Sequence, residues 1–196
     1  MRLKSGTTVV GAITFFVLML SASGAFALDG YKDRKNVFGG LGAGGGIGFV
    51  NQEGDLAEEG PGLHLQGILG SGVSQRFLVG VEADWWSRTV DKSNNNEYGY
   101  YHTSIGALAN FFLIDGDRGG LRLDGGAGFA YGICNGTFEG DECDWQELGL
   151  EAEVGAGYEF WFNGTMTGAV DVSYTHHFYS HSAFDTITGS FGFKWY

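Results

Sequence analysis

Charged residues recur at alternate positions within otherwise apolar stretches of this sequence. The members of this set are Glu82, Asp84, Arg88, Arg122, Asp124, Glu151, Glu153, Glu159, Asp171 and Lys194. Successive side chains of a strand point to opposite faces, so we expect these charges to share one side of a sheet. Charges enclosed there must be paired or hydrated. The set predicts an internal network of ion pairs or, because acids outnumber bases, a narrow path for cations.

Three of the five histidines lie close together near the C-terminal end of the chain. His176, His177 and His181 precede Asp185. Imidazole and carboxylate groups together can bind zinc or copper. Because the spacing matches no established metal motif, chance surface histidines are the simpler interpretation. We predict neither a metal site nor a cofactor.

A nucleophile and a base are also present in this region. Ser173 and His177 share a strand face, but they are four residues apart, which is too far for a direct hydrogen bond. The adjacent His181 and Ser182 would point to opposite faces. A hydrolase is therefore an alternative, and the main prediction is a protein that is not an enzyme.

The segment from Glu147 to Phe162 shows most clearly what positions these groups. All its even positions are apolar, and four of its odd positions are glutamates. This pattern predicts a strand with one apolar and one acidic face. The segment is long enough to cross a bilayer, for which roughly 9–11 tilted residues suffice. We expect Ala152 to face lipid near the middle of the membrane and Glu153 to face the interior.

Eight segments of this kind follow one another along the chain. We predict strands over 37–50, 62–70, 76–89, 98–113, 121–133, 147–162, 166–175 and 186–196. Short turns and longer polar loops alternate between them, which is typical of outer-membrane barrels. The polar loops are expected at 51–60, 91–97 and 135–145 and before residue 186. The sequence therefore predicts an all-β protein, an eight-stranded antiparallel up-and-down transmembrane β-barrel.

Glycines occupy five successive even positions of the first predicted strand, from Gly40 to Gly48. Glycine weakens a strand, so this row needs a reason, and crowding inside a narrow barrel supplies one. A soluble secreted barrel of lipocalin type, with its apolar face inside, is the alternative fold.

The turn after the sixth predicted strand decides which side chains of the next strand face outward. We expect a three-residue loop over 162–164, with Gly164 left-handed and Trp161 paired with Thr165. In this register Val170 and Val172 face outward and Asp171 faces inward.

The N-terminal 27 residues have the features of a secretory signal peptide. Arg2 and Lys4 precede the apolar run 9–20, and the small residues Ala25 and Ala27 place a cleavage site before Leu28. We therefore expect a cleaved signal peptide over 1–27, a periplasmic lead-in over 28–36 and the barrel over 37–196. Cleavage removes Arg2 and Lys4 and takes the net charge from −12 to −14. Such acidity argues against a nucleic-acid partner.

Cys134 and Cys143 are the two cysteines of the chain. Both lie in the exported part, where disulfides persist, and they flank one predicted loop. We expect a disulfide bridge between them.

The pattern as a whole resembles the small eight-stranded outer-membrane barrels of the OmpA, OmpX and opacity type. The C-terminal sequence SFGFKWY looks like the terminal strand of that family. In the family this strand helps the assembly machinery recognise the barrel, which implies such a role for Phe191, Phe193, Trp195 and Tyr196. Tyr196 is one residue out of phase with the other three.

The resemblance implies a monomeric protein of the bacterial outer membrane, in contact with its lipid. A structural or surface-interaction role would follow, with a host or surface ligand bound by four extracellular loops. Some outer-membrane barrels are lipid A-modifying hydrolases, which is the enzymatic alternative.

Overall fold

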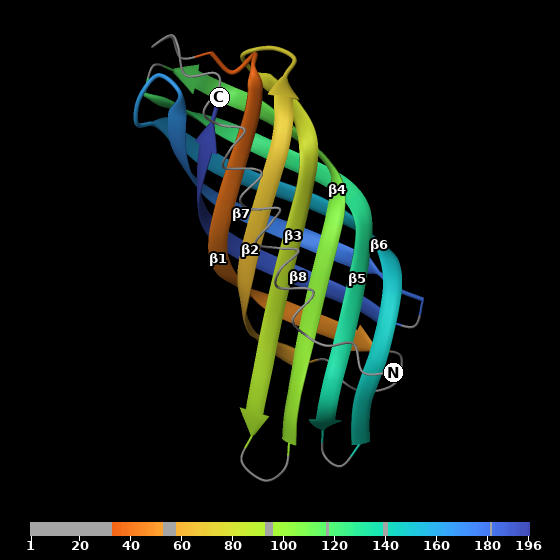
Figure 1. Cartoon of the computed structure of the whole chain (residues 1–196). Helices are drawn as coiled ribbons and strands as arrows, with labels where there is room; N and C mark the ends of the chain where they lie inside the picture. The colour runs from red at the N-terminus through yellow and green to blue at the C-terminus, as the bar shows by residue number, and fades with distance from the viewer. Residues whose placement is uncertain (1–32, 53–57, 93–95, 117, 139–140, 181) are drawn as a thin grey trace, which may run out of the picture.

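Eight strands joined in chain order close into one barrel in the computed structural model of the chain (Figure 1). The strands are β1 (Val37–Gln52), β2 (Glu58–Gly72), β3 (Phe77–Lys92), β4 (Asn96–Gly116), β5 (Gly119–Phe138), β6 (Asp141–Trp161), β7 (Met166–Phe178) and β8 (Ser182–Trp195). Every neighbouring pair is antiparallel, including β1 with β8, so the predicted fold is confirmed.

The structure describes residues 33–196 except 53–57, 93–95, 117, 139–140 and 181, and leaves out the side chains within 50–59, 90–98, 137–143 and 181–182. The predicted signal peptide, with Ala25, Ala27 and Leu28, lies outside the described residues and stays a prediction. Within the described part, no helix is long and apolar enough to cross a membrane.

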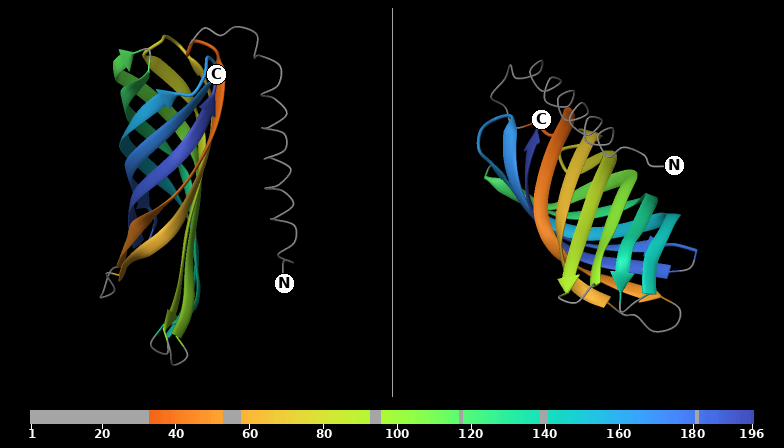
Figure 2. Two further views of the ribbon diagram at one scale, coloured as in Figure 1. Left: turned by 90° about the vertical axis from the view of Figure 1, so that its left-hand side faces the viewer. Right: turned by 60° about the horizontal axis from the view of Figure 1, so that its bottom comes forward.

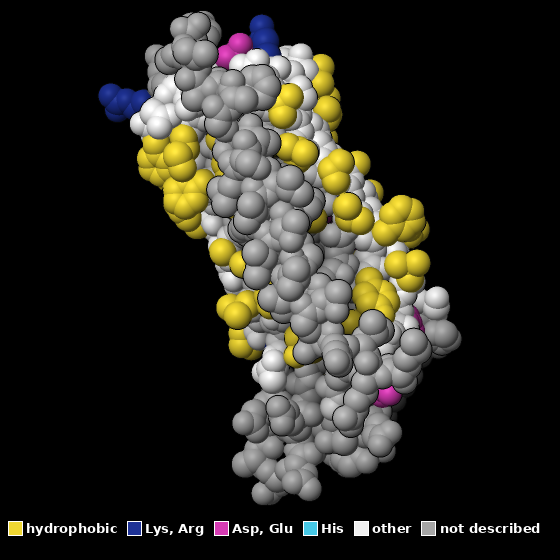
Figure 3. Space-filling model, in the orientation of Figure 1, with side chains coloured by type: hydrophobic (Ala, Val, Ile, Leu, Met, Phe, Trp, Pro, Cys, Tyr) yellow, Lys and Arg dark blue, Asp and Glu magenta, His cyan; other side chains and the backbone are white. Residues whose placement is uncertain are grey.

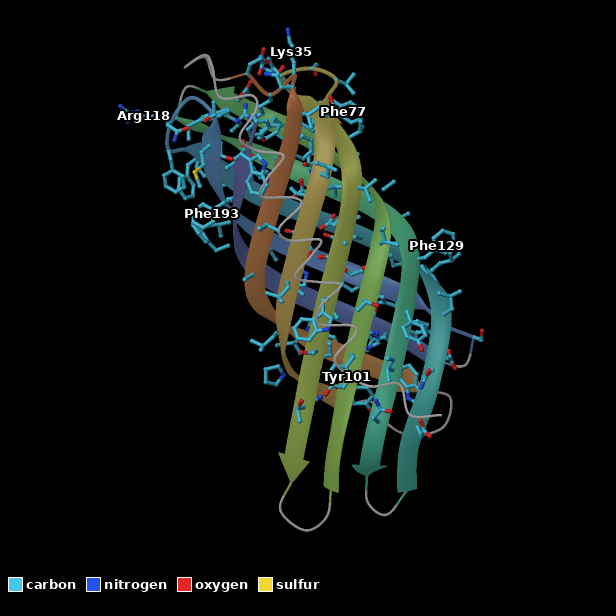
Figure 4. All side chains as sticks on the ribbon, viewed as in Figure 1. Lys35, Phe77, Tyr101, Arg118, Phe129 and Phe193 are labelled. Carbon is cyan, nitrogen blue, oxygen red and sulfur yellow. The ribbon has the colours of Figure 1, made fainter. Side chains whose placement is uncertain are left out.

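Apolar side chains cover the outside of the barrel and charged side chains lie inside it. On β6, Leu148 and Val154 are exposed while Glu151 and Glu159 are buried. Hydrophobic side chains are spread over the outer surface in Figure 3, and Phe129 and Phe193 point away from the barrel in Figure 4. This arrangement is the opposite of a lipocalin, so the soluble alternative is wrong.

The glycines of β1 make room for close contacts inside the barrel. A Cβ added at Gly44 would lie 2.0 Å from the carbonyl oxygen of Gly189. A Cβ at Gly48 would lie 2.7 Å from Phe184 and 2.8 Å from Trp86. Crowding was the predicted reason for this row of glycines, and the structure confirms it.

The strands are longer than predicted at the end that carries the polar loops. The predicted loop 135–145 is mostly strand, since β5 and β6 remain paired out to Phe138 and Asp141. Likewise, β3 and β4 pair out to Lys92 and Asn96, within the predicted loop 91–97. Strand hydrogen bonds join backbone groups and need no apolar side chains, so pairing continues where the apolar alternation ends.

The turn between β6 and β7 differs from its prediction. Trp161 pairs with Thr167 rather than Thr165, and Gly164 is not among the described glycines with positive φ. The side chain of Asn163 forms the turn, because its Oδ1 accepts the backbone N–H groups of Thr165 at 2.9 Å and Met166 at 2.8 Å. The register moves by two residues, so the predicted outward face of β7 is retained.

Candidate functional site

Glu159 is the centre of the charge network in the half of the lumen near the short turns. Its carboxylate is fully buried, at 0% exposure. It accepts a hydrogen bond from Arg34 Nε at 3.0 Å and lies 3.5 Å from Arg122 Nη1 and 3.7 Å from Lys194 Nζ. Three cations thus surround one carboxylate, at the centre of the network.

Arg34 comes from the lead-in before β1 and fills this end of the barrel. Its guanidinium lies over the ring of Phe112 at 4.0 Å and that of Trp161 at 5.0 Å, and it also pairs with Asp115. Burial acts to lower the pKa of Arg34, but the charge of Glu159, the nearby Tyr196 and the hydrogen bonds to Glu159 and Asp115 together outweigh it, and the net shift is upward. Phe38 and Tyr196 pack in the same cluster. The lumen is therefore closed at this end by a charged and aromatic plug.

Arg122 gathers the remaining acids of this half. Its Nε lies 2.8 Å from Asp124 and its Nη2 lies 2.5 Å from Asp171. Asp124 also accepts a hydrogen bond from Asn110 at 2.6 Å. The predicted ion-pair network is present here, and it joins strands β4, β5 and β7 across the lumen.

Three further carboxylates lie together deeper in the lumen. Oxygens of Glu82, Asp84 and Glu153 are all within 4.8 Å of one another. His64 Nε2 lies 2.9 Å from Asp84, and Gln66 donates to Glu82. Among the described residues no lysine or arginine forms an ion pair with these three acids. This part of the network is an acidic cluster rather than a set of ion pairs.

Arg88 is the member of the predicted set that lies apart. Its side chain comes close to Gly60, where an added Cβ would be 2.0 Å from the guanidinium carbon. In the described part of the chain it takes no part in the ion pairs of the lumen. The remaining predicted members all line the interior, as expected.

Aromatic rings and histidines fill the other half of the lumen. Trp86, Tyr100, Cys134 and Phe184 form a buried cluster, with Trp145 and Tyr179 packed against it. His102 is stacked on Phe184, with ring centres 3.7 Å apart, and its Nδ1 lies 2.9 Å from the hydroxyl of Tyr179. Burial raises the pKa of Tyr179, so its hydroxyl keeps its proton.

The contact between His102 and His177 could not be predicted from their spacing in the sequence. They come from β4 and β7, yet their ring centres are 5.3 Å apart. His102 has inward parity on its strand, which was the one available signal. Their proximity follows from the narrowness of the closed barrel.

The histidines that were considered together in the sequence are separated by the barrel wall. His176 is outside, where its Nδ1 lies 2.5 Å from Asp185, whereas His177 points into the lumen. His181 lies outside the described residues. A metal site that includes both His176 and His177, the alternative considered from the sequence, is therefore wrong.

The groups considered for a hydrolase are not paired with each other. Ser173 Oγ lies 2.8 Å from Thr188 Oγ1, and His177 Nδ1 donates to the carbonyl oxygen of Phe184 at 3.1 Å. In the described part of the chain, these two residues do not form a nucleophile and base pair.

Cys134 is buried on the inner face of β5, and none of the described cysteines is free. Its strand partner on β6 is Trp145, and Cys143 of β6 pairs with Gly136, two residues further along β5. The side chain of Cys143 lies outside the described residues, so the disulfide stays a prediction.

A four-stranded sheet extends beyond the rest of the barrel (Figures 1 and 2). Pairing of β3 with β2 starts at Ser87, and pairing of β6 with β7 ends at Leu150. Beyond these points β3 to β6 remain paired with one another. The extension therefore has two strand edges, on β3 and on β6, without a neighbouring strand among the described residues.

Known structures with the same fold come from bacterial outer membranes. Ail of Yersinia pestis, in complex with the heparin analogue sucrose octasulfate, aligns with a TM-score of 0.57 and 17% identity over 81% of this chain and 99% of Ail. Neisserial surface protein A aligns with a TM-score of 0.51 and 12% identity over 80% of this chain and 96% of that protein. At these identities the likeness concerns the fold. No curated protein matches the chain by sequence comparison.

The family of the chain is shown by its sequence rather than by the structural similarity. The model of the outer membrane protein beta-barrel domain matches residues 13–195. The match covers nearly the whole chain, including all eight strands. The apolar outer surface and charged lumen agree with a location in the outer membrane. The chain belongs to the outer membrane protein beta-barrel domain family.

Proposed function

We propose that the protein is a monomeric surface-interaction protein whose ligand binds to the sheet extension of β3 to β6. The observation that carries this proposal is the pair of open edges on that extension. An unpaired strand edge presents backbone donors and acceptors to which an extended polypeptide can add as a further strand. The predicted specificity of the four loops is thus assigned mainly to two hairpins, β3–β4 and β5–β6.

The charge of this region points to the class of ligand. Between residues 88 and 97 and between 139 and 147 the sequence has two bases, Arg88 and Lys92. The acids in these ranges are Asp91, Glu97, Glu139, Asp141, Glu142, Asp144 and Glu147. Such an excess of acids repels polyanions and attracts cationic partners. A basic extended polypeptide therefore suits this chain better than a sulfated ligand of the kind crystallised with Ail.

Binding to the purified mature barrel in lipid nanodiscs tests this function. We expect basic extended peptides to bind and sulfated polysaccharide not to bind. Asp144→Lys should weaken binding, and shortening both hairpins should abolish it. Asp33→Lys, at the opposite end of the barrel, is the matched control and should leave binding unchanged. Equal binding by the shortened and complete proteins would remove the hairpins as the binding site.

A cation channel is the second candidate. Among the described residues, four acids of the lumen form no ion pair with a lysine or arginine: Glu82, Asp84, Glu151 and Glu153. The plug around Arg34 opposes conduction through the barrel. We expect no steady current in planar bilayers from the wild-type barrel. A steady cation-selective current would favour the channel instead.

Assembly is proposed to depend on the C-terminal strand. Phe191 and Phe193 are exposed on the outer face of β8, whereas Tyr196 is buried inside the plug. We therefore assign recognition by the assembly machinery to Phe191, Phe193 and Trp195, and a role in closing the folded barrel to Tyr196. Substituting Phe193 by Ser should slow insertion into membranes, whereas Tyr196→Phe should not.

A further inference from the structure

A small cavity in the outer half of the lumen brings imidazole and carboxylate groups together. Its volume is about 20 Å³, enough for a single water or ion. The titratable side chains that line it are His64, Asp84, His102, Glu151, Glu153 and His177. They come from strands β2, β3, β4, β6 and β7, so this set exists only in the closed barrel.

Two of these histidines are held through their Nδ1 atoms. His177 Nδ1 donates to the backbone carbonyl of Phe184 at 3.1 Å, because a carbonyl oxygen can only accept. His102 Nδ1 lies 2.9 Å from the hydroxyl of Tyr179. Histidines that bind metals usually have one ring nitrogen fixed in this way, which leaves the other nitrogen as the ligand.

The Nε2 atom of His102 is not satisfied by the described part of the protein, and that of His177 faces a carboxylate. His102 is 2% exposed, and its Nε2 has no hydrogen-bond partner among the described residues. His177 Nε2 lies 3.6 Å from Glu151 Oε2, beyond ordinary hydrogen-bond distance. Two ligand atoms at about 2.0–2.2 Å from a tetrahedral zinc ion are separated by roughly this distance. A buried nitrogen without a partner requires an explanation, and a bound ion provides one.

We propose that this cavity binds one divalent transition-metal ion, Zn²⁺ or Cu²⁺, through His102 Nε2, His177 Nε2 and the carboxylate of Glu151. Imidazole with carboxylate is a ligand set that suits both ions. Asp84 and Glu153 line the same cavity and add negative charge that favours a cation. The three donor atoms are not all within 4.8 Å of one another, so binding draws the His102 ring toward Glu151 and His177.

The acidic cluster of Glu82, Asp84 and Glu153 is the competing position for an ion. Its oxygens are already within 4.8 Å of one another and would suit a hard cation such as Ca²⁺. However, Glu82 is bonded to Gln66 and Asp84 to His64. His64 Nδ1 and His102 Nε2 are both buried without a hydrogen-bond partner among the described residues. The histidine site is favoured because it offers two imidazole nitrogens and a carboxylate, the ligand set that suits Zn²⁺ and Cu²⁺, whereas the acidic cluster offers carboxylates.

Metal titration of the chelator-treated mature barrel in detergent micelles tests the proposal. We expect one equivalent of Zn²⁺ or Cu²⁺ to bind by calorimetry, and bound Cu²⁺ to show nitrogen coupling in its electron paramagnetic resonance spectrum. His102→Gln and His177→Gln should each weaken binding by about 10–100-fold or more. The matched control is His176→Gln, the neighbouring residue on the outer face, which should bind as the wild type does.

Folding and the competing site are checked in the same experiment. Each variant is first shown to migrate as a heat-modifiable band. If His102→Gln does not fold, Tyr179→Phe replaces it. This variant keeps all three ligands but removes the hydroxyl next to His102 Nδ1. It should lose less metal affinity than His177→Gln. Absence of binding by the wild type would overturn the proposal. Loss of binding in Glu82→Gln with full binding in His177→Gln, or loss in His176→Gln alone, would also overturn it.

Discussion

The hydroxyl of Tyr196, the last residue of the chain, donates to both carboxylate oxygens of Glu159, at 3.1 and 3.0 Å. This contact ties the end of β8 to the middle of the plug, where Arg34, Arg122 and Lys194 share the same carboxylate. Glu159 therefore contributes both to closure of the barrel and to the charge balance of its lumen.

Neutralising this carboxylate should destabilise the barrel strongly. In Glu159→Gln three buried cations lose a partner, and removing one member of a buried pair costs about 3–5 kcal/mol. Tyr196→Phe is the milder variant, because it removes one hydroxyl that binds a charged group, worth about 1.5–3 kcal/mol. Urea unfolding followed by the heat-modifiable band gives both values. Equal stability of Glu159→Gln and the wild type would show that the plug does not support the fold.

Depth in the membrane should separate two alanines of β6 that both face outward. The sequence placed Ala152 near mid-membrane, but its neighbour on β7 is His176, which pairs with Asp185 on the outer surface. Ala156 instead lies between Leu123 and Val172. A polar pair indicates the edge of the apolar band, so Ala156 is nearer the membrane centre.

Arginine at these two positions measures that difference. Ala156→Arg should cost about 2–4 kcal/mol, whereas Ala152→Arg should cost less, toward 0–1 kcal/mol. Glu153→Gln is the control for the inner face and should cost little, because neither Arg122 nor Lys194 pairs with Glu153. Unfolding in urea from lipid bilayers gives the values. A larger loss in Ala152→Arg than in Ala156→Arg would restore the depth expected from the sequence.

Two glycines on either side of the β1–β8 seam should differ in their tolerance of alanine. The methyl group of Gly44→Ala would lie 2.0 Å from a backbone oxygen, whereas the nearest atom to that of Gly189→Ala is 4.0 Å away. We expect Gly44→Ala to cost about 1–3 kcal/mol through overpacking, and Gly189→Ala to stay within about 0.5 kcal/mol of the wild type. Refolding yield and urea midpoint measure both. Similar values for the two variants would mean that β1 shifts away from β8 at little cost.

The predicted bridge between Cys134 and Cys143 should be present in protein isolated without reductant. Both thiols should resist alkylation in urea until reductant is added. Reduction should then make the hairpin between β5 and β6 more sensitive to protease, while the heat-modifiable band remains, because the barrel below does not depend on it. Two thiols that react without reductant would disprove the bridge.

The side of the barrel wall to which each side chain points could be predicted from the sequence alone, because it depends on the local alternation of apolar and polar residues. Leu150 and Glu151 must point to opposite sides of β6 whatever the strand pairs with. For the same reason the strand number, the apolar outer surface and the inward position of Asp171 were all predictable. Even the wrong register at Asn163 kept these faces, since it was displaced by two residues.

Contacts across the lumen were decided by the tertiary structure. Arg34 reaches Glu159 across 125 positions of sequence, and His102 meets His177 because a closed barrel brings opposite strands together. Periodicity gives the side of a strand but not its stagger against its neighbours or the residues opposite. Ala152 illustrates the difference. Its outward direction follows from the sequence, but its depth depends on pairing with His176, which is fixed only when β6 and β7 come into register.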